Sequence, residues 1–361
     1  MIKSLLFAFS LSFFLNFIFI YLFNHKKFRD TFEGPQKFHV EPTPRVGGLA
    51  IVLSVIISAI FFYYFVFYKT EIFYILLSAI PITVAGLVED IVKKVTVKIR
   101  LFAAFISVII GILLLNIVII SIDIPFFDNL FQIRVFAYIF TILAISGVAN
   151  SINIIDGYNG LSSVVSILIF LALGYVSFEL NDVFVLGMCF IMMGAIGGFF
   201  IWNYPFGKIF LGDGGAYFIG FIIAVLSILL VNRNNAVSPW FPLLVVIYPV
   251  FETIFSIYRR KILKKTKIGH PDSFHLHQLM YKRVIPFIFE IDRNDKLLRN
   301  SATSPFLWLI CSLAIIPAIL FWQHTYVLVF FVFLFCIFYI MLYRNIAKFK
   351  IGRILKYLKT Y

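Results

Sequence analysis

Long apolar stretches separated by short polar ones recur along the whole chain. Each stretch is close to the roughly 20 residues that a helix needs to cross a bilayer. The pattern predicts an all-α, polytopic integral membrane protein with about eleven (10–11) transmembrane helices. The expected spans are residues 4–23, 47–68, 72–88, 101–120, 135–152, 160–179, 183–202, 214–231, 241–258, 305–322 and 326–343.

Composition agrees with this pattern, since 62% of the 361 residues are hydrophobic and only 13% are charged. These values exclude an ordinary soluble globular protein. The first stretch is interpreted as a span and not as a signal peptide. Lys3 is the only base ahead of it, and no small-residue cleavage site follows it.

The basic residues are unevenly distributed over the gaps between the expected spans. With the N-terminus outside, only four of the 31 Lys and Arg residues fall on the outer side: Lys3, Lys69, Arg134 and Arg233. Because cytoplasmic loops carry the excess of Lys and Arg, the N-terminus is predicted outside and the C-terminus in the cytoplasm. This bias, with anionic lipid or substrate as partner, explains the net charge of +14 without a nucleic-acid partner.

Residues 1–343 are expected to form a single transmembrane helical domain. Its largest cytoplasmic loop covers residues 259–304 and is strongly basic. Residues 344–361 mix bases with aromatic and aliphatic side chains. We therefore expect this tail to be a basic amphipathic helix on the cytoplasmic membrane surface.

A polar sequence separates the fifth and sixth expected spans. Asn150, Asn153 and Asp156 are spaced by three, so they share one face if the preceding helix continues. Gly157 and Gly160 then end that helix and let the backbone approach a ligand. Polar side chains at membrane depth are costly and usually mark a functional site. The alternative is a polar helix end that is rich in Asn.

Two further polar sequences fall on the predicted cytoplasmic side. Glu89 and Asp90 end the third span, and four bases that include Lys98 follow. Such a carboxylate pair holds a divalent cation or accepts a proton, or it is a solvated helix end of balanced charge. Arg45 precedes the second span, where it either meets an anion or is an ordinary membrane anchor.

A glycine-rich loop at residues 203–215 precedes the eighth span and contains Phe210 and Asp213. Glycine-rich turns that lead into a helix present free backbone N–H groups to anions. Asp213 lies near the start of the helix, where a carboxylate is also simply a good cap. Both interpretations of Asp213 remain open at this point.

Three histidines lie within eight residues of the large loop, among them His275 and His277. Because no cysteine is near and the setting is strongly basic, they suit a diphosphate better than zinc. Glu252, near the cytoplasmic end of the ninth span, is either a structural partner of a nearby arginine or part of the site.

Carboxylates, amides, bases and histidines thus gather on the predicted cytoplasmic face. Mg²⁺ is the metal that such oxygen ligands and a phosphate-bearing substrate favour, with Mn²⁺ as an alternative. The matching chemistry is phosphoryl transfer, in which metal and bases neutralise charge on the reacting diphosphate. An active site at the membrane plane lets one substrate be a lipid.

The motifs, in this order, resemble those of the polyprenyl-phosphate N-acetylhexosamine-1-phosphate transferases (glycosyltransferase family 4). The resemblance covers nearly the whole chain, from Pro44-Arg-Val-Gly-Gly48 to His275-Leu-His277. It implies transfer of a sugar-1-phosphate from a UDP-sugar to undecaprenyl phosphate, with release of UMP. The family acts in the bacterial cytoplasmic (inner) membrane, where its members start peptidoglycan lipid, teichoic acid and O-antigen synthesis.

The resemblance, taken with the residue chemistry, gives each motif a role. Glu89 and Asp90 stand where the family has an Asp-Asp pair for the lipid phosphate, and Phe210 matches an aromatic that packs on uracil. Glu89, Asn159 and Gln278 depart from the commonest family residues. The expected sets are catalytic residues Glu89, Asp90, Asp156, His275 and His277, substrate-binding residues Arg45, Lys98, Asn150, Asn153, Asn159 and Phe210, and metal ligands Asp213, Asn153 and Asp156.

The implied partners are undecaprenyl phosphate, a UDP-amino sugar, membrane lipid and a second copy in a homodimer. UDP-N-acetylglucosamine is the commonest donor in the family, but the sequence leaves the sugar and the glycan product open. Two other classes stay in view: a membrane transporter, and a non-catalytic lipid-binding protein of the same fold. The carboxylates lie at helix ends, whereas a transporter with a midplane ion site would place them near helix centres.

Overall fold

The computed structural model describes residues 1–23, 43–67, 69–263, 274–289, 291–292 and 295–348. Within these ranges the chain forms helices joined by loops and contains no β-strand. The predicted all-helical class is therefore confirmed. The predicted amphipathic tail falls mostly on residues 349–361, which lie outside the described residues.

Among the described residues, ten helices are long and apolar enough to cross a membrane, and they match ten of the predicted spans. Most ends differ from the predicted ends by at most five residues, as with Glu71–Val92 for 72–88 and Thr325–Ala347 for 326–343. The largest difference is in Lys296–Leu320, which was predicted as 305–322. The ten are α1 (Ile2–Leu22), α2 (Gly47–Phe62, extended by a π-helical turn, Tyr63–Phe67), α3 (Glu71–Val92), α4 (Val97–Leu115), α6 (Arg134–Ile155), α7 (Leu161–Glu179), α8 (Val183–Asn203), α9 (Gly212–Arg233), α14 (Lys296–Leu320) and α15 (Thr325–Ala347).

The ninth predicted span, residues 241–258, is not one continuous helix. It consists of α10 (Trp240–Val245) and α11 (Ile247–Tyr258), with a break at Val246. Pro249 explains the break, because its ring excludes the carbonyl group four residues earlier and it has no N–H to donate. The apolar stretch was identified correctly, but its continuity was not.

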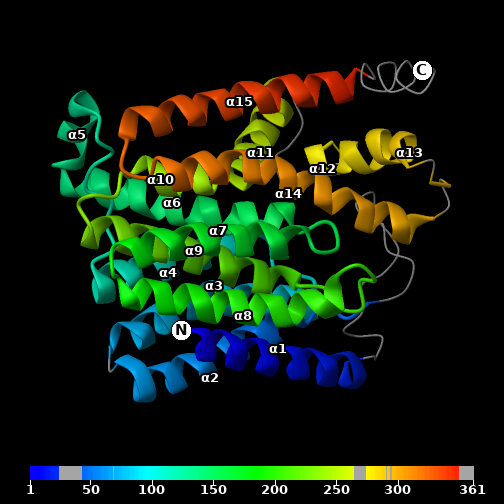
Figure 1. Cartoon of the computed structure of the whole chain (residues 1–361), viewed down its shortest axis with the longest axis horizontal. Coiled ribbons are helices and arrows are strands. Elements are labelled where there is room, and N and C mark those ends of the chain that lie inside the picture. Colours follow the sequence, from blue (N-terminus) through cyan, green and yellow to red (C-terminus); the bar gives the residue numbers. More distant parts are fainter. Residues whose placement is uncertain (24–42, 68, 264–273, 290, 293–294, 349–361) are drawn as a thin grey trace.

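The predicted loop 259–304 is itself largely helical where the structure describes it. It begins with a π-helical segment (Arg259–Leu263) that continues α11. It then contains α12 (Leu276–Leu279), a second π-helical segment (Met280–Val284) and α13 (Ile285–Ile288), and its last residues already belong to α14. In Figure 1, α12 and α13 lie at one end of the bundle and α5 (Pro125–Phe131) at the other. We call these the site end and the α5 end.

Helix α9 is the central element of the bundle. Of its most apolar window, 94% is buried, against 17% for α1 and 22% for α15. It packs against α2, α3, α6 and α7 (Figure 1). Glycines let its first turn approach two neighbours closely: a Cβ on Gly86 of α3 would lie 2.6 Å from the Cα of Gly214, and one on Gly48 of α2 would lie 2.4 Å from the Cα of Gly215. Such small-residue contacts are typical of membrane helices.

Candidate active site

The side chain of Asp213 lies at the centre of a charged cluster at the site end of α9. Its Oδ1 atom accepts hydrogen bonds from Arg45 Nη2 at 3.2 Å and from Asn153 Nδ2 at 3.1 Å. Its Oδ2 atom accepts one from Arg100 Nη1. The carboxylate is only 12% exposed, so it is a largely buried anion with two guanidinium partners. The loop before α2 and the helices α4, α6 and α9 contribute to this one cluster.

Asp90, at the end of α3, holds the N-terminus of α9 in place. Its two carboxylate oxygens accept hydrogen bonds from the backbone N–H groups of Asp213 (2.8 Å) and Gly214 (2.9 Å). A carboxylate at this position satisfies free N–H groups and interacts favourably with the helix dipole. Gly212 has a φ of +77°, and a Cβ there would lie 2.6 Å from Asp90 Oδ2, so this approach requires glycine.

Glu89, the neighbour of Asp90, points elsewhere. Its Oε2 atom accepts a hydrogen bond from the backbone N–H of Val95 at 2.7 Å. The bond closes the turn after α3, where Lys93 adopts a left-handed conformation with φ of 57°. The two adjacent carboxylates therefore have different partners, and only Asp90 contacts the backbone of Asp213.

Two loops that are far apart in the sequence position Arg45. The backbone N–H of Phe210 donates to the carbonyl oxygen of Pro44 at 2.9 Å, and Gly47 N–H donates to the carbonyl oxygen of Phe210 at 3.0 Å. Pro44 and Arg45 lie just before α2, which begins at Gly47. This pairing places Arg45 beside Asp213 and 3.5 Å from Asp90 Oδ1.

Asn150 and Asn153 occupy the last turns of α6, but the helix ends at Ile155, so Asp156 lies just beyond it. Asn150 Oδ1 accepts a hydrogen bond from Tyr217 Oη of α9 at 3.3 Å, and Asn153 donates to Asp213. Asp156 follows the helix and accepts a bond of 2.5 Å from Ser162 Oγ. The first two side chains thus share the face that α6 turns toward α9, as predicted.

The carboxyl of Asp156 has a raised pKa of about 6. Burial is the main cause, because it disfavours the charged form. The hydrogen bond from Ser162 and the charge of Arg45 act in the opposite direction, and the charge of Asp213 adds to the rise. Asp156 therefore lies within electrostatic range of both Arg45 and Asp213.

The loop histidines are buried beside this cluster. His277 is 2% exposed, and its Nε2 atom would lie 3.4 Å from a Cβ placed on Gly157. Its ring stacks on that of His275, with centroids 5.2 Å apart, and meets the edge of Tyr158 at 5.5 Å. The sequence 156–158 and the distant loop are therefore in contact, as the resemblance implies for one common site.

Glu252 of α11 holds His275 in place. One carboxylate oxygen lies 2.9 Å from His275 Nδ1, and the other accepts a hydrogen bond of 2.6 Å from Tyr339 Oη of α15. The backbone N–H of Leu276 also donates to this carboxylate, at 3.2 Å. Glu252 therefore contacts one of the predicted site residues, His275, and its bonds to His275 and Tyr339 join α11, the large loop and α15.

Asn159 has a structural environment. Its side-chain amide donates to the carbonyl oxygen of Pro205 at 2.9 Å, and its backbone N–H donates to Asn300 Oδ1 at 2.9 Å. Its backbone carbonyl accepts a bond of 2.6 Å from Ser304 Oγ. These bonds join the loop after α6 to the loop after α8 and to α14. The predicted role in substrate binding is therefore not supported by a contact with the Asp213 cluster.

Lys98 is exposed to solvent, whereas Arg100, two residues later, reaches Asp213. The two side chains point to opposite sides of α4, because two residues turn a helix by about 200°. The sequence contains a signal that distinguishes Arg100 from Lys98. The small buried residues of α4 recur with helical spacing on one face, and Arg100 continues that face: Ala104, Ser107, Val108 and Gly111.

The donor set suits a magnesium ion that is bound partly through substrate. Among the residues that the structure describes, no group of three or more His, Cys, Asp or Glu side chains has metal-binding geometry. Mg²⁺, however, usually needs only one or two carboxylates when phosphate oxygens and waters complete its shell. The carboxylates of Asp213 and Asp156, with the amide of Asn153, fit that requirement.

These observations define a class: a multi-pass helical membrane protein whose buried carboxylates and arginines converge at one end of the bundle. Comparison with known proteins then gives the family. The model of glycosyl transferase family 4 matches residues 72–231. The chain belongs to this family, because it also aligns with curated members over most of their length.

Three relatives illustrate the match. A probable undecaprenyl-phosphate N-acetylglucosaminyl 1-phosphate transferase of Bacillus subtilis (strain 168) is 31% identical, over 67% of this chain and 66% of its own length. A phospho-N-acetylmuramoyl-pentapeptide-transferase of Staphylococcus aureus (strain bovine RF122 / ET3-1) is 31% identical, over 66% of this chain and 79% of its own length. The corresponding protein of Staphylococcus epidermidis (strain ATCC 12228 / FDA PCI 1200) is 30% identical, over 66% and 79%.

Proposed function

We propose that this protein transfers an N-acetylhexosamine-1-phosphate from a UDP-sugar to undecaprenyl phosphate and releases UMP. The observation that carries the proposal is the Asp213 cluster, in which Arg45, Arg100 and Asn153 surround one carboxylate at a membrane face. The names of the relatives support the same reaction class. In the predicted orientation the site faces the cytoplasm of a bacterium, where nucleotide sugars are made, and the product starts a cell-envelope glycan.

Arg45 and Arg100 are the groups that would bind the diphosphate of the nucleotide sugar. Guanidinium groups match phosphate geometry and stay charged at every physiological pH. In the structure both are paired with Asp213. Phosphate oxygens compete for the same N–H donors, so substrate binding would draw the arginines toward the diphosphate and leave the carboxylate for a cation.

Mg²⁺, when bound, would neutralise charge that develops on the diphosphate. Asp213 and Asp156 would hold it together with Asn153, all of which lie at the site ends of α6 and α9. Each of these residues is fixed by its own neighbours: Asn153 by the turn of α6, Asp156 by Ser162, and Asp213 by the backbone bonds to Asp90. Such rigid placement is what phosphoryl transfer requires from a protein.

In the proposed reaction an oxygen of the lipid phosphate forms a bond to the β-phosphorus of the UDP-sugar. The bond from this phosphorus to the α,β-bridging oxygen breaks, and UMP leaves with that oxygen. A phosphate monoester is already largely ionised at pH 7, so the attack needs no protein base. This suits the observed position of Asp90, whose two oxygens are both engaged by backbone N–H groups. We assign Asp90 a positioning role instead of a proton-accepting one.

His275 and Glu252 form a pair that would orient one ring nitrogen toward the site. When a carboxylate accepts the proton on Nδ1, the Nε2 atom is left for a ligand. Glu252 is 1% exposed and also bound by Tyr339, so this orientation is fixed from two helices. His277 lies beside Gly157 and extends the same surface toward the proposed metal ligands.

The test is UMP release by the purified full-length protein. The assay would contain undecaprenyl phosphate, Mg²⁺ and one UDP-amino sugar at a time, with N-acetylglucosamine, N-acetylgalactosamine and 6-deoxy amino sugars in the panel. Lipid-dependent UMP from one donor would establish the reaction and the sugar together. If UMP forms equally without lipid, the activity is hydrolysis of the UDP-sugar and not transfer to the lipid. If no donor gives UMP, a transporter or a non-catalytic lipid-binding protein is favoured.

A further inference from the structure

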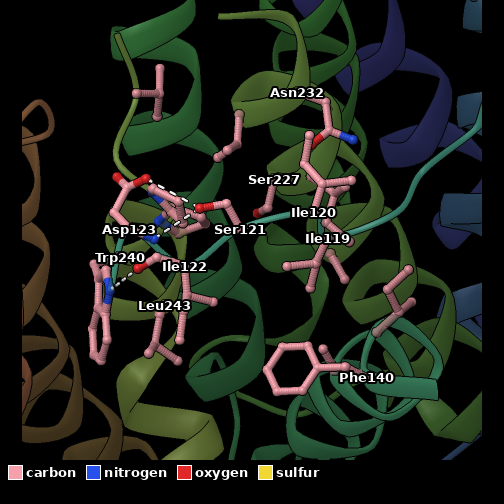
Figure 2. A pocket seen from close by; sticks show the side chains of 18 of the residues that line it. Ile119, Ile120, Ser121, Ile122, Asp123, Phe140, Ser227, Asn232, Trp240 and Leu243 are labelled. Atoms are coloured by element: carbon pink, nitrogen blue, oxygen red, sulfur yellow. Dashed lines mark hydrogen bonds between the residues drawn. The ribbon is translucent and has the colours of Figure 1, made fainter. Parts of the chain in front are cut away.

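A cavity lies on the same face of α9 as the candidate active site, but in the half toward the α5 end. Its volume is about 520 Å³, and its walls come from α6, α9, α10 and the segment 119–123. Figure 2 shows apolar side chains around most of it, including those of Ile119, Phe140 and Leu243. The α9 residues on its wall have the spacing of one helix face: Ala224, Ser227, Ile228 and Val231.

A direct contact between α6 and α9 lies between this cavity and the Asp213 cluster. Asp213 and Tyr217 lie on the α9 face that continues to Ala224. At Gly220, between Tyr217 and Ala224, α6 packs directly on α9: a Cβ on Gly220 would lie 2.7 Å from the Cα of Ala149. The cavity lining begins beyond this contact, with Val148 and Ala224, and does not include the residues of the Asp213 cluster.

The deeper part of the cavity contains one polar group without a partner. The Ser227 hydroxyl makes no hydrogen bond within the described structure, and the residue is only 6% exposed. The buried helix serines Ser54 and Ser177 bond to the carbonyl oxygen four residues earlier. Four others share the state of Ser227 but do not line this cavity: Ser58, Ser146, Ser163 and Ser166. Figure 2 shows Ser227 among the residues that line the cavity. A buried hydroxyl that has no partner is costly, so it indicates a ligand with a hydrogen-bond acceptor at this depth.

The mouth of the cavity at the α5 end is polar and lacks positive charge. It includes Ser121, Asp123 and Asn235, and no Lys or Arg lies among the lining residues. Asp123 is bound only by hydroxyl groups, from Thr325 at 2.9 Å and Ser121 at 3.4 Å. A carboxylate in this setting attracts an ammonium group and repels an anionic head group.

We propose that the cavity binds a zwitterionic glycerophospholipid of the α5-end leaflet, which is the outer leaflet in the predicted orientation. One acyl chain fills the apolar part, Ser227 donates to an ester carbonyl oxygen, and the ammonium of a phosphatidylethanolamine head group lies at Asp123. The depths agree. Ser227 is five residues below Asn232 on α9, about 7 Å along the axis, which is close to the thickness of one head-group layer, about 5–8 Å.

The experiment is native mass spectrometry of the purified full chain after incubation with equal amounts of phosphatidylethanolamine and phosphatidylglycerol, plus undecaprenyl phosphate. The wild type should retain one phosphatidylethanolamine. Ala144→Phe and Val148→Phe each fill the cavity and should lower retention about tenfold or more. Ser227→Ala should lower it roughly 3- to 10-fold through loss of one hydrogen bond.

Leu143→Phe is the matched control, because this neighbour on α6 is 58% exposed and lies outside the cavity wall. It should retain lipid as the wild type does. UMP release and thermal unfolding of every variant would report folding independently of lipid retention. Unchanged retention in both folded filling variants would overturn the proposal. So would cavity-dependent retention of phosphatidylglycerol or undecaprenyl phosphate in place of phosphatidylethanolamine.

Discussion

At the scale of single residues, charge pairing distinguishes the site from its surroundings. Asp213 has two arginine partners, one from the loop before α2 and one from the start of α4. Arg100 is 15% exposed in its side chain, whereas Lys98 is exposed and makes no contact with Asp213 in the structure. Only the first of these two bases contacts this carboxylate in the structure.

Replacement of the two bases should separate their roles. Arg100→Gln removes a charged donor from the cluster and should lower UMP release about 100-fold or more. Lys98→Gln changes a solvated side chain and should leave the rate within about twofold of the wild type. Initial rates at saturating lipid and varied UDP-sugar provide the measurement. Equal losses from both substitutions would contradict the assignment of Arg100.

The raised pKa of Asp156 predicts a pH dependence of magnesium use. A metal ligand must be ionised, and a carboxyl with a pKa of about 6 becomes protonated as the pH falls through that value. The Mg²⁺ concentration for half-maximal UMP release should therefore rise steeply below pH 6 and change little above pH 7. Asp156→Asn should abolish this dependence and greatly weaken activity. A magnesium requirement that is the same at pH 5.5 and pH 7.5 would argue against Asp156 as a ligand.

At the scale of helices, the sequence indicated most of the architecture. Ten spans follow from hydropathy alone, because each is a long apolar run. The break at Val246 lies inside an equally apolar run, so only Pro249 reveals it. The helical turns of the large loop were missed for another reason: they are short, and their stability comes from contacts such as Glu252 with His275 instead of from a local pattern.

The candidate site was predicted in its members but only partly in its contacts. Spacing by three placed Asn150 and Asn153 correctly on one face of α6. No local pattern shows that Asp90 accepts bonds from the N-terminus of α9, since 123 residues separate the partners. The same limit applies to Asn159, whose bonds to α14 and to the loop after α8 arise only in the folded bundle.

The close contact of α3 with α9 should be sensitive to a single methyl group. Gly86→Ala would place its Cβ 2.6 Å from Gly214, so the helices must separate and Asp90 must move away from the first turn of α9. We expect a loss of about 1–3 kcal/mol in stability and a clear fall in UMP release.

Gly147→Ala on α6 is the matched control for this contact. Nothing lies within 4 Å of its added Cβ, so it should be neutral or slightly stabilising. Thermal unfolding of the detergent-solubilised variants gives the comparison. The packing argument fails if Gly86→Ala and Gly147→Ala behave alike.

At the scale of the whole molecule, all of the proposed catalytic residues lie at one end of the bundle and the proposed lipid cavity opens at the other. Helix α9 connects the two, with its first turn in the site and its last turns, from Ala224 onward, at the cavity (Figure 1). The asymmetry of Lys and Arg predicts which end is cytoplasmic, and the proposed reaction requires the site end to face the cytoplasm.

Labelling of introduced cysteines in cells tests this orientation. Asn129→Cys, exposed on α5, should react with a membrane-impermeant maleimide in intact cells. Lys94→Cys, exposed after α3, should react only after permeabilisation. The three native cysteines are buried or partly buried and provide the background signal in the parent protein. The reverse pattern would place the site outside and would exclude cytoplasmic UDP-sugars as substrates.

The most direct test of the central claim is lipid-dependent UMP release by wild-type protein and by Asp213→Asn, each over a range of Mg²⁺ concentrations. The wild type should release UMP only with Mg²⁺ and undecaprenyl phosphate. The substitution keeps the size of the side chain and removes its charge, so we expect a loss of about 1,000-fold or more with no change in thermal stability large enough to explain it. Full turnover by Asp213→Asn, with an unchanged magnesium requirement, would contradict the assignment of this carboxylate as the catalytic centre.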